Sequence, residues 1–189
     1  WTAYTEFVTK KGTNVNEPVV TVKGGKQWLY GGLRMGGKSY YALDLSDVTS
    51  SSGTPKLKFH INPAGTCSTT NALGCMGQSW SKPTLTWVNW QGKRKLVMLV
   101  GGGYDAAYES SVDYTPSNTD QGAGIYMFDA DNGNLLWWAS ANAGSTNTAT
   151  NKTYAAEMKR SVVSSIKAID RNSDGITDHL YFGDLGRQV

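Results

Sequence analysis

The segment from residue 170 to 178 holds the side chains whose types and spacing most clearly indicate chemistry. Side-chain oxygens stand at every second position, followed by a glycine and one more carboxylate. Hard oxygen donors at this spacing wrap a cation and favour Ca2+ over zinc or copper. The glycine allows a sharp bend, after which a backbone carbonyl can point back at the ion. The predicted ligands are Asp170, Asn172, Asp174, the backbone oxygen of Ile176, and Asp178.

A solvated turn is the alternative interpretation of this segment, since Asp, Asn and Gly all favour turns. Against it, the pattern continues over the whole segment, and Ile169 and Ile176 stand where a loop held between strands would bury them. The segment is not a complete EF-hand, because Tyr181 replaces the usual final glutamate and neither flank has a helical pattern. We therefore expect a structural calcium site carried by strands.

The sequence contains no pattern that points clearly to catalysis. Residues 32–39 fit the phosphate-loop pattern G-x-x-x-x-G-K-[ST], but residues 40–45 alternate like a strand, whereas the motif requires a helix there. A glycine-rich hairpin between two strands is the better interpretation. The sequence has no G-x-S-x-G or H-E-x-x-H motif and only 2 histidines, so we expect that the protein is not an enzyme.

The two cysteines, Cys67 and Cys75, enclose a stretch rich in Ser, Thr, Asn and Gly. A disulfide that closes this short loop is the favoured interpretation, and two free buried thiols are the alternative. A disulfide together with a calcium site would place the protein outside the cytoplasm.

The composition predicts an all-β protein. Charged residues make up only 17% of the chain, which holds 22 glycines, 7 tryptophans and 10 tyrosines, as in short strands joined by tight turns. The net charge of +3 is mild, and we expect the basic residues 93–95 to form a solvated hairpin tip, so no nucleic-acid partner is predicted. No apolar run is long enough to cross a bilayer.

One strand pattern recurs along the chain. An apolar strand ending in glycine, a variable connection and an aromatic strand ending in aspartate occur at residues 28–44 and 96–129, and a third copy begins at 179–184. Recurring meanders of short strands predict propeller blades. We therefore predict one domain over residues 1–189, a partial, modified β-propeller with about three recognisable blades and decorated loops.

Other expectations concern the connections and the ends of the chain. Further strands are predicted at 81–88 and 161–169, and the best helix candidate is 153–158. Because the chain begins at Trp1 and stops in a strand-like pattern at 186–189, we expect it to be a piece of a larger protein. The long insertions lie at residues 46–79, 104–123 and 139–160.

Three patches of the sequence resemble the PilY1/PilC family, the large secreted proteins of type IV pili whose C-terminal half is a modified β-propeller. Residues 169–186 are similar to the family's calcium loop and following strand, and residues 31–44 and 79–84 are similar to other patches of that propeller. The resemblance implies that Ca2+ is the bound ion, held by the same five residues at 170, 172, 174, 176 and 178.

This resemblance implies a place and a role for the protein. The location would be extracellular, at the tip of a pilus on the bacterial cell surface, reached through the periplasm and outer membrane. The partners would be minor pilins and a host-cell or surface receptor. The role would be adhesion, support of pilus biogenesis, and control of the extension and retraction that drive twitching motility.

Two other propeller classes are weighed against this one. A quinone-dependent dehydrogenase has similar aromatic repeats, as at residues 125–137, but would need calcium ligands from separated positions around its cofactor. A carbohydrate-binding propeller could use exposed rings such as Trp87, Trp90 and Tyr104, although the same aromatic side chains commonly form strand core.

Overall fold

A computed structural model describes residues 1–6, 25–48, 52–110, 119–146 and 149–186. These residues form three β-sheets joined by loops and short 3-10 turns, with no α-helix among them. The prediction of an all-β, propeller-like fold is therefore confirmed. Residues 187–189, most of the predicted final strand, lie outside the described part of the chain.

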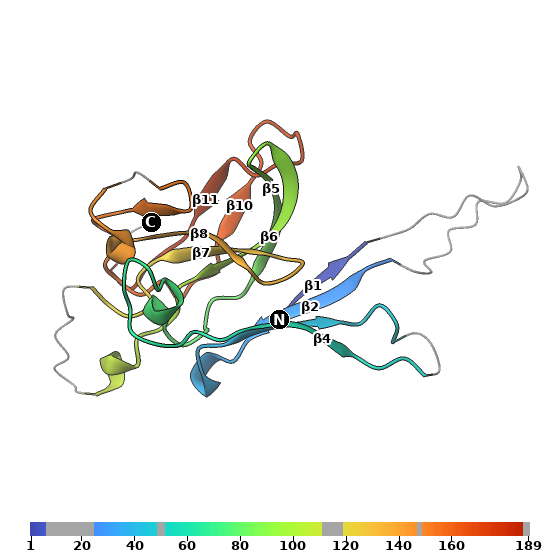
Figure 1. The fold of residues 1–189 in the computed structure, drawn as a ribbon, viewed down its shortest axis with the longest axis horizontal. Coiled ribbons are helices and arrows are strands. Elements are labelled where there is room, and N and C mark those ends of the chain that lie inside the picture. The colour runs from blue at the N-terminus through green and yellow to red at the C-terminus, as the bar shows by residue number, and fades with distance from the viewer. Residues whose placement is uncertain (7–24, 49–51, 111–118, 147–148, 187–189) are drawn as a thin grey trace, which may run out of the picture.

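The first two sheets are meanders in sequence order, antiparallel except for the last strand of the second, as expected for propeller blades (Figure 1). The first sheet consists of β1 (Thr2–Thr5), β2 (Gln27–Gly32), β3 (Tyr40–Asp44) and β4 (Lys56–Ile61). The second consists of β5 (Thr84–Trp90), β6 (Lys93–Gly101), β7 (Ile125–Asp129), β8 (Leu135–Ser140) and β9 (Lys152–Tyr154), of which β9 pairs parallel to β8. The described part of the third sheet is the antiparallel pair β10 (Lys167–Ile169) and β11 (His179–Tyr181).

Short 3-10 turns lie in the connections. They are η1 (Arg34–Gly36), η2 (Leu73–Cys75), η3 (Ala106–Glu109) and η4 (Ala141–Ala143). The η1 turn joins β2 to the antiparallel β3, so residues 32–39 form a hairpin connection and not a phosphate loop.

Two elements of the structure differ from those predicted from the sequence. The helix candidate 153–158 is wrong, because Thr153 and Tyr154 belong to β9, where they pair with β8. The predicted strand 161–169 is shortened to β10, and Ser161 makes only an isolated bridge to Ala123. Between Ser161 and β10, the backbone oxygens of Val162 and Ser164 accept hydrogen bonds from Gly103, just after β6, and from Ser81, just before β5. Local patterns could not reveal these tertiary partners.

The second sheet is covered on both faces. Along β6, Met98 and Val100 face the first sheet, whereas Val97 and Leu99 belong to the cluster shared with the third. Strand side chains alternate between faces, so burial on both sides requires an unbroken apolar run. Figure 1 shows the first sheet, in blue and cyan, on one side of this sheet and the β10–β11 pair on the other.

Close backbone approaches join successive sheets where their second strands end in glycine. A Cβ atom on Gly101, the last residue of β6, would collide with the backbone oxygen of Val162. The Gly101 N–H donates to the Ser81 hydroxyl at 2.9 Å, and that hydroxyl donates to the Ser164 carbonyl at 2.7 Å. The Ser164 hydroxyl in turn accepts from the Gly183 N–H at 3.0 Å, just after β11. Ser81, three residues before β5, and Ser164, three residues before β10, are thus equivalent: each hydroxyl accepts from the N–H of a glycine at or just after the end of a second strand.

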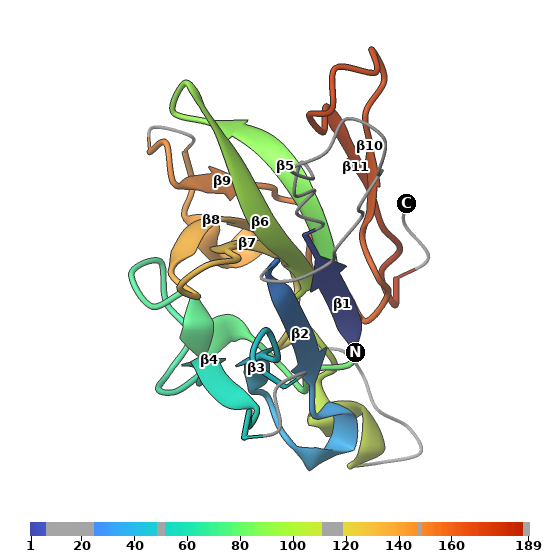
Figure 2. The same ribbon diagram turned by 90° about the vertical axis from the view of Figure 1, so that its right-hand side faces the viewer.

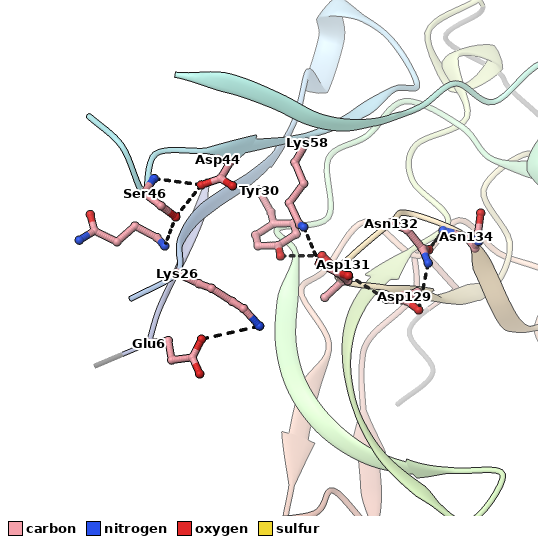
Figure 3. Close-up of polar contacts among 12 residues, drawn as sticks. Glu6, Lys26, Tyr30, Asp44, Ser46, Lys58, Asp129, Asp131, Asn132 and Asn134 are labelled. Carbon is pink, nitrogen blue, oxygen red and sulfur yellow. Dashed lines mark hydrogen bonds and ion pairs between the residues drawn. The ribbon is translucent and has the colours of Figure 1, made fainter. Parts of the chain in front are cut away.

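Figure 3 shows charged contacts that join the first sheet to the β7–β8 turn. Lys58 of β4 reaches Asp131 at 2.6 Å, and the Tyr30 hydroxyl donates to the Ala130 carbonyl at 2.8 Å. Within the second sheet, Lys95 binds the buried Asp129 at 2.7 Å. Burial raises the pKa of the Asp129 carboxyl, but the Lys95 ammonium and the Asp131 backbone N–H lower it by more, leaving it below its usual value.

We predict that Gly101→Ala destabilises the protein by about 1–3 kcal/mol, because the new methyl group must displace backbone. Urea unfolding measures the effect. Gly36→Ala is the matched control, since its Cβ would meet only the Leu33 Cβ at 3.5 Å. Equal stability of the two variants would contradict the proposed close approach between sheets.

We also predict a pH-dependent effect of Asp129→Asn. A carboxyl whose pKa is lowered by folding stabilises the protein above its unfolded pKa, and this stabilisation disappears as pH falls through its folded pKa. The variant should therefore lose about 1.5–3 kcal/mol near neutral pH, the range for hydrogen bonds to charged groups, and less in acid. Urea unfolding from pH 7 down to the acid range tests this. A pH-independent difference would show that the ionised carboxyl is not responsible.

Candidate metal centre in the third sheet

The segment 170–178 connects β10 to β11, with Ile169 and His179 as the last paired residues. The Asp178 N–H donates to the Ile169 carbonyl at 2.9 Å and closes the base of the loop. The flanks are strands, so the expected placement of this loop on a strand pair is confirmed. Ile169 and Ile176 are half-buried beneath an otherwise largely exposed loop.

Backbone N–H groups already order the first predicted ligands. Both carboxylate oxygens of Asp170 accept hydrogen bonds, from the N–H of Asp174 at 3.2 Å and of Gly175 at 2.7 Å. The Asn172 side-chain oxygen accepts from the Asp174 N–H at 3.1 Å, and its amide donates to the Asp174 carboxylate at 3.1 Å. These bonds turn three predicted ligand side chains toward one short stretch of backbone.

The remaining ligand positions are fixed by the same kind of contact. Asp174 accepts from the Ile176 N–H at 2.8 Å, and Asp178 accepts from the Arg171 N–H at 2.8 Å. The backbone turns in the left-handed region at Ser173 (φ 63°) and Gly175 (φ 82°). Glycine tolerates that region without steric cost, as the predicted bend requires.

The predicted ligands keep the oxygen lone pairs that a hard cation needs. An ionised carboxylate offers about four lone-pair directions, so one or two N–H contacts leave acceptor capacity for a metal. The five predicted ligands are all oxygens, which suits Ca2+. In the described residues, however, no three Asp, Glu, His or Cys side chains come close enough together to form a metal site. The donor chemistry fits calcium, and calcium binding stays a prediction.

The loop is attached to the second sheet. The Thr177 N–H donates to the Trp87 carbonyl of β5 at 2.8 Å, and the hydroxyls of Thr177 and Thr86 lie 2.6 Å apart. An Arg94 nitrogen lies 3.5 Å from the Gly175 carbonyl. A change of loop conformation would therefore alter hydrogen bonds made by β5 and by the β5–β6 hairpin.

The other predicted site residues lie away from this loop. Cys67 and Cys75 form a disulfide with an S–S distance of 2.02 Å, which excludes the alternative of free thiols. In the described residues no helix has the length and apolar character needed to span a bilayer. A disulfide is typical of an oxidising compartment.

The basic and aromatic candidates are placed differently from the expectation. Residues 93–95 begin strand β6 directly after the hairpin tip Gln91–Gly92, and Lys93 and Arg94 are exposed, so the basic residues lie beside the tip and not in it. The Arg94 guanidinium lies 4.7 Å from the centre of the Trp87 ring. Trp90 packs against the cluster between the second and third sheets, and Tyr104 stacks with Tyr108. Sequence reasoning missed the Arg94–Trp87 contact, although their cross-strand separation in a hairpin was a usable signal.

A comparison with solved structures finds the crystal structure of the Pseudomonas aeruginosa PilY1 C-terminal domain, with 25% sequence identity and a TM-score of 0.55. The match covers 85% of this chain and 25% of that one, so this chain spans about a quarter of its length. No protein-family model and no curated protein matches the sequence. The sheets described above and this similarity together give the chain a PilY1-like, all-β propeller fold.

Proposed function

We propose that this chain is the calcium-binding propeller segment of a type IV pilus-associated protein of the bacterial cell surface. The PilY1-like fold supports the pilus association. The hydrogen-bonded loop 170–178, built from oxygen donors between two strands, supports the calcium site. The role is binding and assembly, without catalysis.

The geometry of the loop 170–178 is the single observation that carries the proposed calcium site. Asp170, Asn172, Asp174, the Ile176 carbonyl and Asp178 would hold the ion. Bound calcium would supply positive charge to a loop with three carboxylates in nine positions. Without the ion, the backbone N–H groups of the loop provide only partial positive charge, at the four carboxylate contacts described above.

The contacts with β5 give the site a structural consequence. Because Thr177 is bonded to both Trp87 and Thr86, an ordered loop holds the third sheet against the second. Ordering of the loop would fix the edge that meets a partner, namely minor pilins at the pilus tip or a surface receptor. In this way the segment would support pilus biogenesis and attachment and oppose retraction.

The calcium site is tested first by titration. We predict one saturable site by calorimetry, with at least about tenfold weaker binding in Asp178→Ala, since a lost carboxylate ligand costs about 1.4 kcal/mol or more. Calcium should also raise the melting temperature of the unaltered protein and not of the variant.

Glu157→Gln is the charge-matched control, because Glu157 is an exposed carboxylate outside the loop. Its calcium affinity should equal that of the unaltered protein. Undiminished binding in Asp178→Ala, or no binding at millimolar calcium, would refute the site.

The pilus role is tested in the bacterium that makes the full-length protein. Asp178→Ala should reduce the number of surface pili and alter twitching, because an unfilled loop no longer opposes retraction. The Glu157→Gln strain should behave normally. If an Asp178→Ala strain has lost calcium binding but still makes a normal number of pili, the proposed role of calcium in pilus control is wrong, whereas the calcium site itself stands.

A further inference from the structure

A groove of about 440 Å3 lies between the β1–β2 side of the first sheet and the β5–β6 and β7–β8 hairpins of the second. It is separate from the predicted metal ligands, none of which lines it. Its volume is in the range of small-ligand sites in proteins. The lining residues are Tyr4, Lys26, Trp28, Trp87, Lys93, Arg94, Lys95, Leu96, Asp129, Asp131 and Asn132.

Aromatic rings hold cations on both walls of the groove. On the first sheet, the Lys58 and Lys26 ammonium groups lie 3.8 and 5.1 Å from the centre of the Trp28 ring. On the second, the Arg94 guanidinium lies 4.7 Å from the centre of the Trp87 ring. Such contacts restrict long flexible side chains, so less entropy is lost when the cation binds a ligand.

The cations in the groove are only partly neutralised. Lys95 is paired with Asp129, Lys58 with Asp131 and Lys26 with Glu6, at 2.7, 2.6 and 3.7 Å. Lys93 and Arg94 are exposed and form no ion pair with any described residue. Of the four basic side chains that line the groove, Lys26 and Lys95 have carboxylate partners, so the charges of Lys93 and Arg94 are the ones left to attract an anion.

Acceptor groups stand beside these cations. Asp131 has a side chain 72% exposed, and the exposed Asn132 is next to it in the β7–β8 turn. Figure 3 shows Asp131 beside Lys58, with Asn132 next to Asp129. An acidic peptide would gain nothing from a carboxylate in its site. A ligand with one carboxylate and several hydroxyl groups would use both the cations and the acceptors.

We propose that this groove binds a carboxylated saccharide. Arg94 and Lys93 bind the sugar carboxylate, for which a guanidinium offers two parallel N–H donors. Asp131 and Asn132 accept from sugar hydroxyls. The half-buried Tyr4 and Trp87 rings contact the apolar C–H face of the sugar ring.

The site lies on the same end of the molecule as the loop 170–178. Figure 2 shows the tips of the β5–β6 and β10–β11 hairpins at one end. Arg94 reaches both the groove and the Gly175 carbonyl. The saccharide proposal nevertheless goes beyond the calcium proposal and does not rest on it, because none of its ligand contacts uses a metal.

The test is a calorimetric titration of the protein at fixed calcium with 3′-sialyllactose and with digalacturonate, which separate sialic from uronic acids. Lactose is the uncharged probe. We expect saturable binding of at least one acidic sugar and much weaker binding of lactose. Arg94→Gln should weaken binding about tenfold or more, as expected for losing hydrogen bonds to a charged group.

Lys167→Gln is the matched control, since it removes one exposed positive charge from β10, outside the groove. Backbone amide shifts in NMR spectra should change at residues 93–96 and 129–132 on titration, and a folded spectrum of Arg94→Gln excludes unfolding as the cause. Binding of neither acidic sugar, equal binding of lactose, undiminished binding in Arg94→Gln, or preference for a hexaglutamate peptide would each overturn the proposal.

Discussion

The structure depends on the close approach of backbone between neighbouring sheets at the glycines that end their second strands. At Gly101 the absence of a side chain lets the Val162 carbonyl come within contact, and at Gly32 the same holds for the Ser79 carbonyl. Serine hydroxyls then bridge the remaining backbone groups, so that buried N–H and carbonyl groups are satisfied across the junction. A larger residue at either glycine would separate the sheets.

This junction between the sheets determines where the two candidate sites lie. Because the second strands are fixed together at their glycine ends, the hairpins formed with their first strands point to the opposite end (Figure 2). The loop 170–178 and the β5–β6 hairpin therefore become neighbours. The contacts of Thr177 with β5 follow from this arrangement. The loops at this opposite end carry the polar and charged groups of both candidate sites, and loops on a packed scaffold commonly bind partners.

Electrostatics has different roles at the two candidate sites. The loop concentrates carboxylates and stabilises them with backbone N–H groups, which suits a cation. The groove concentrates Lys and Arg side chains on tryptophan rings, with carboxylates that neutralise some of them, which suits an anion. These opposite preferences at adjacent positions come from side chains of three sheets, and both Arg94 and Trp87 line the groove and contact the loop.

The sequence alone determined the strand meanders, the hairpin in place of a phosphate loop, and the strand-borne position of residues 170–178, because these depend on local periodicity and turn chemistry. The tertiary structure decided what pairs over long distances. It made residues 153–154 a strand beside β8, shortened the predicted strand 161–169 to β10 with an inter-sheet link before it, and placed Lys58 on Asp131. Neither periodicity nor composition encodes such pairings, since their free energy arises only when distant strands pack together.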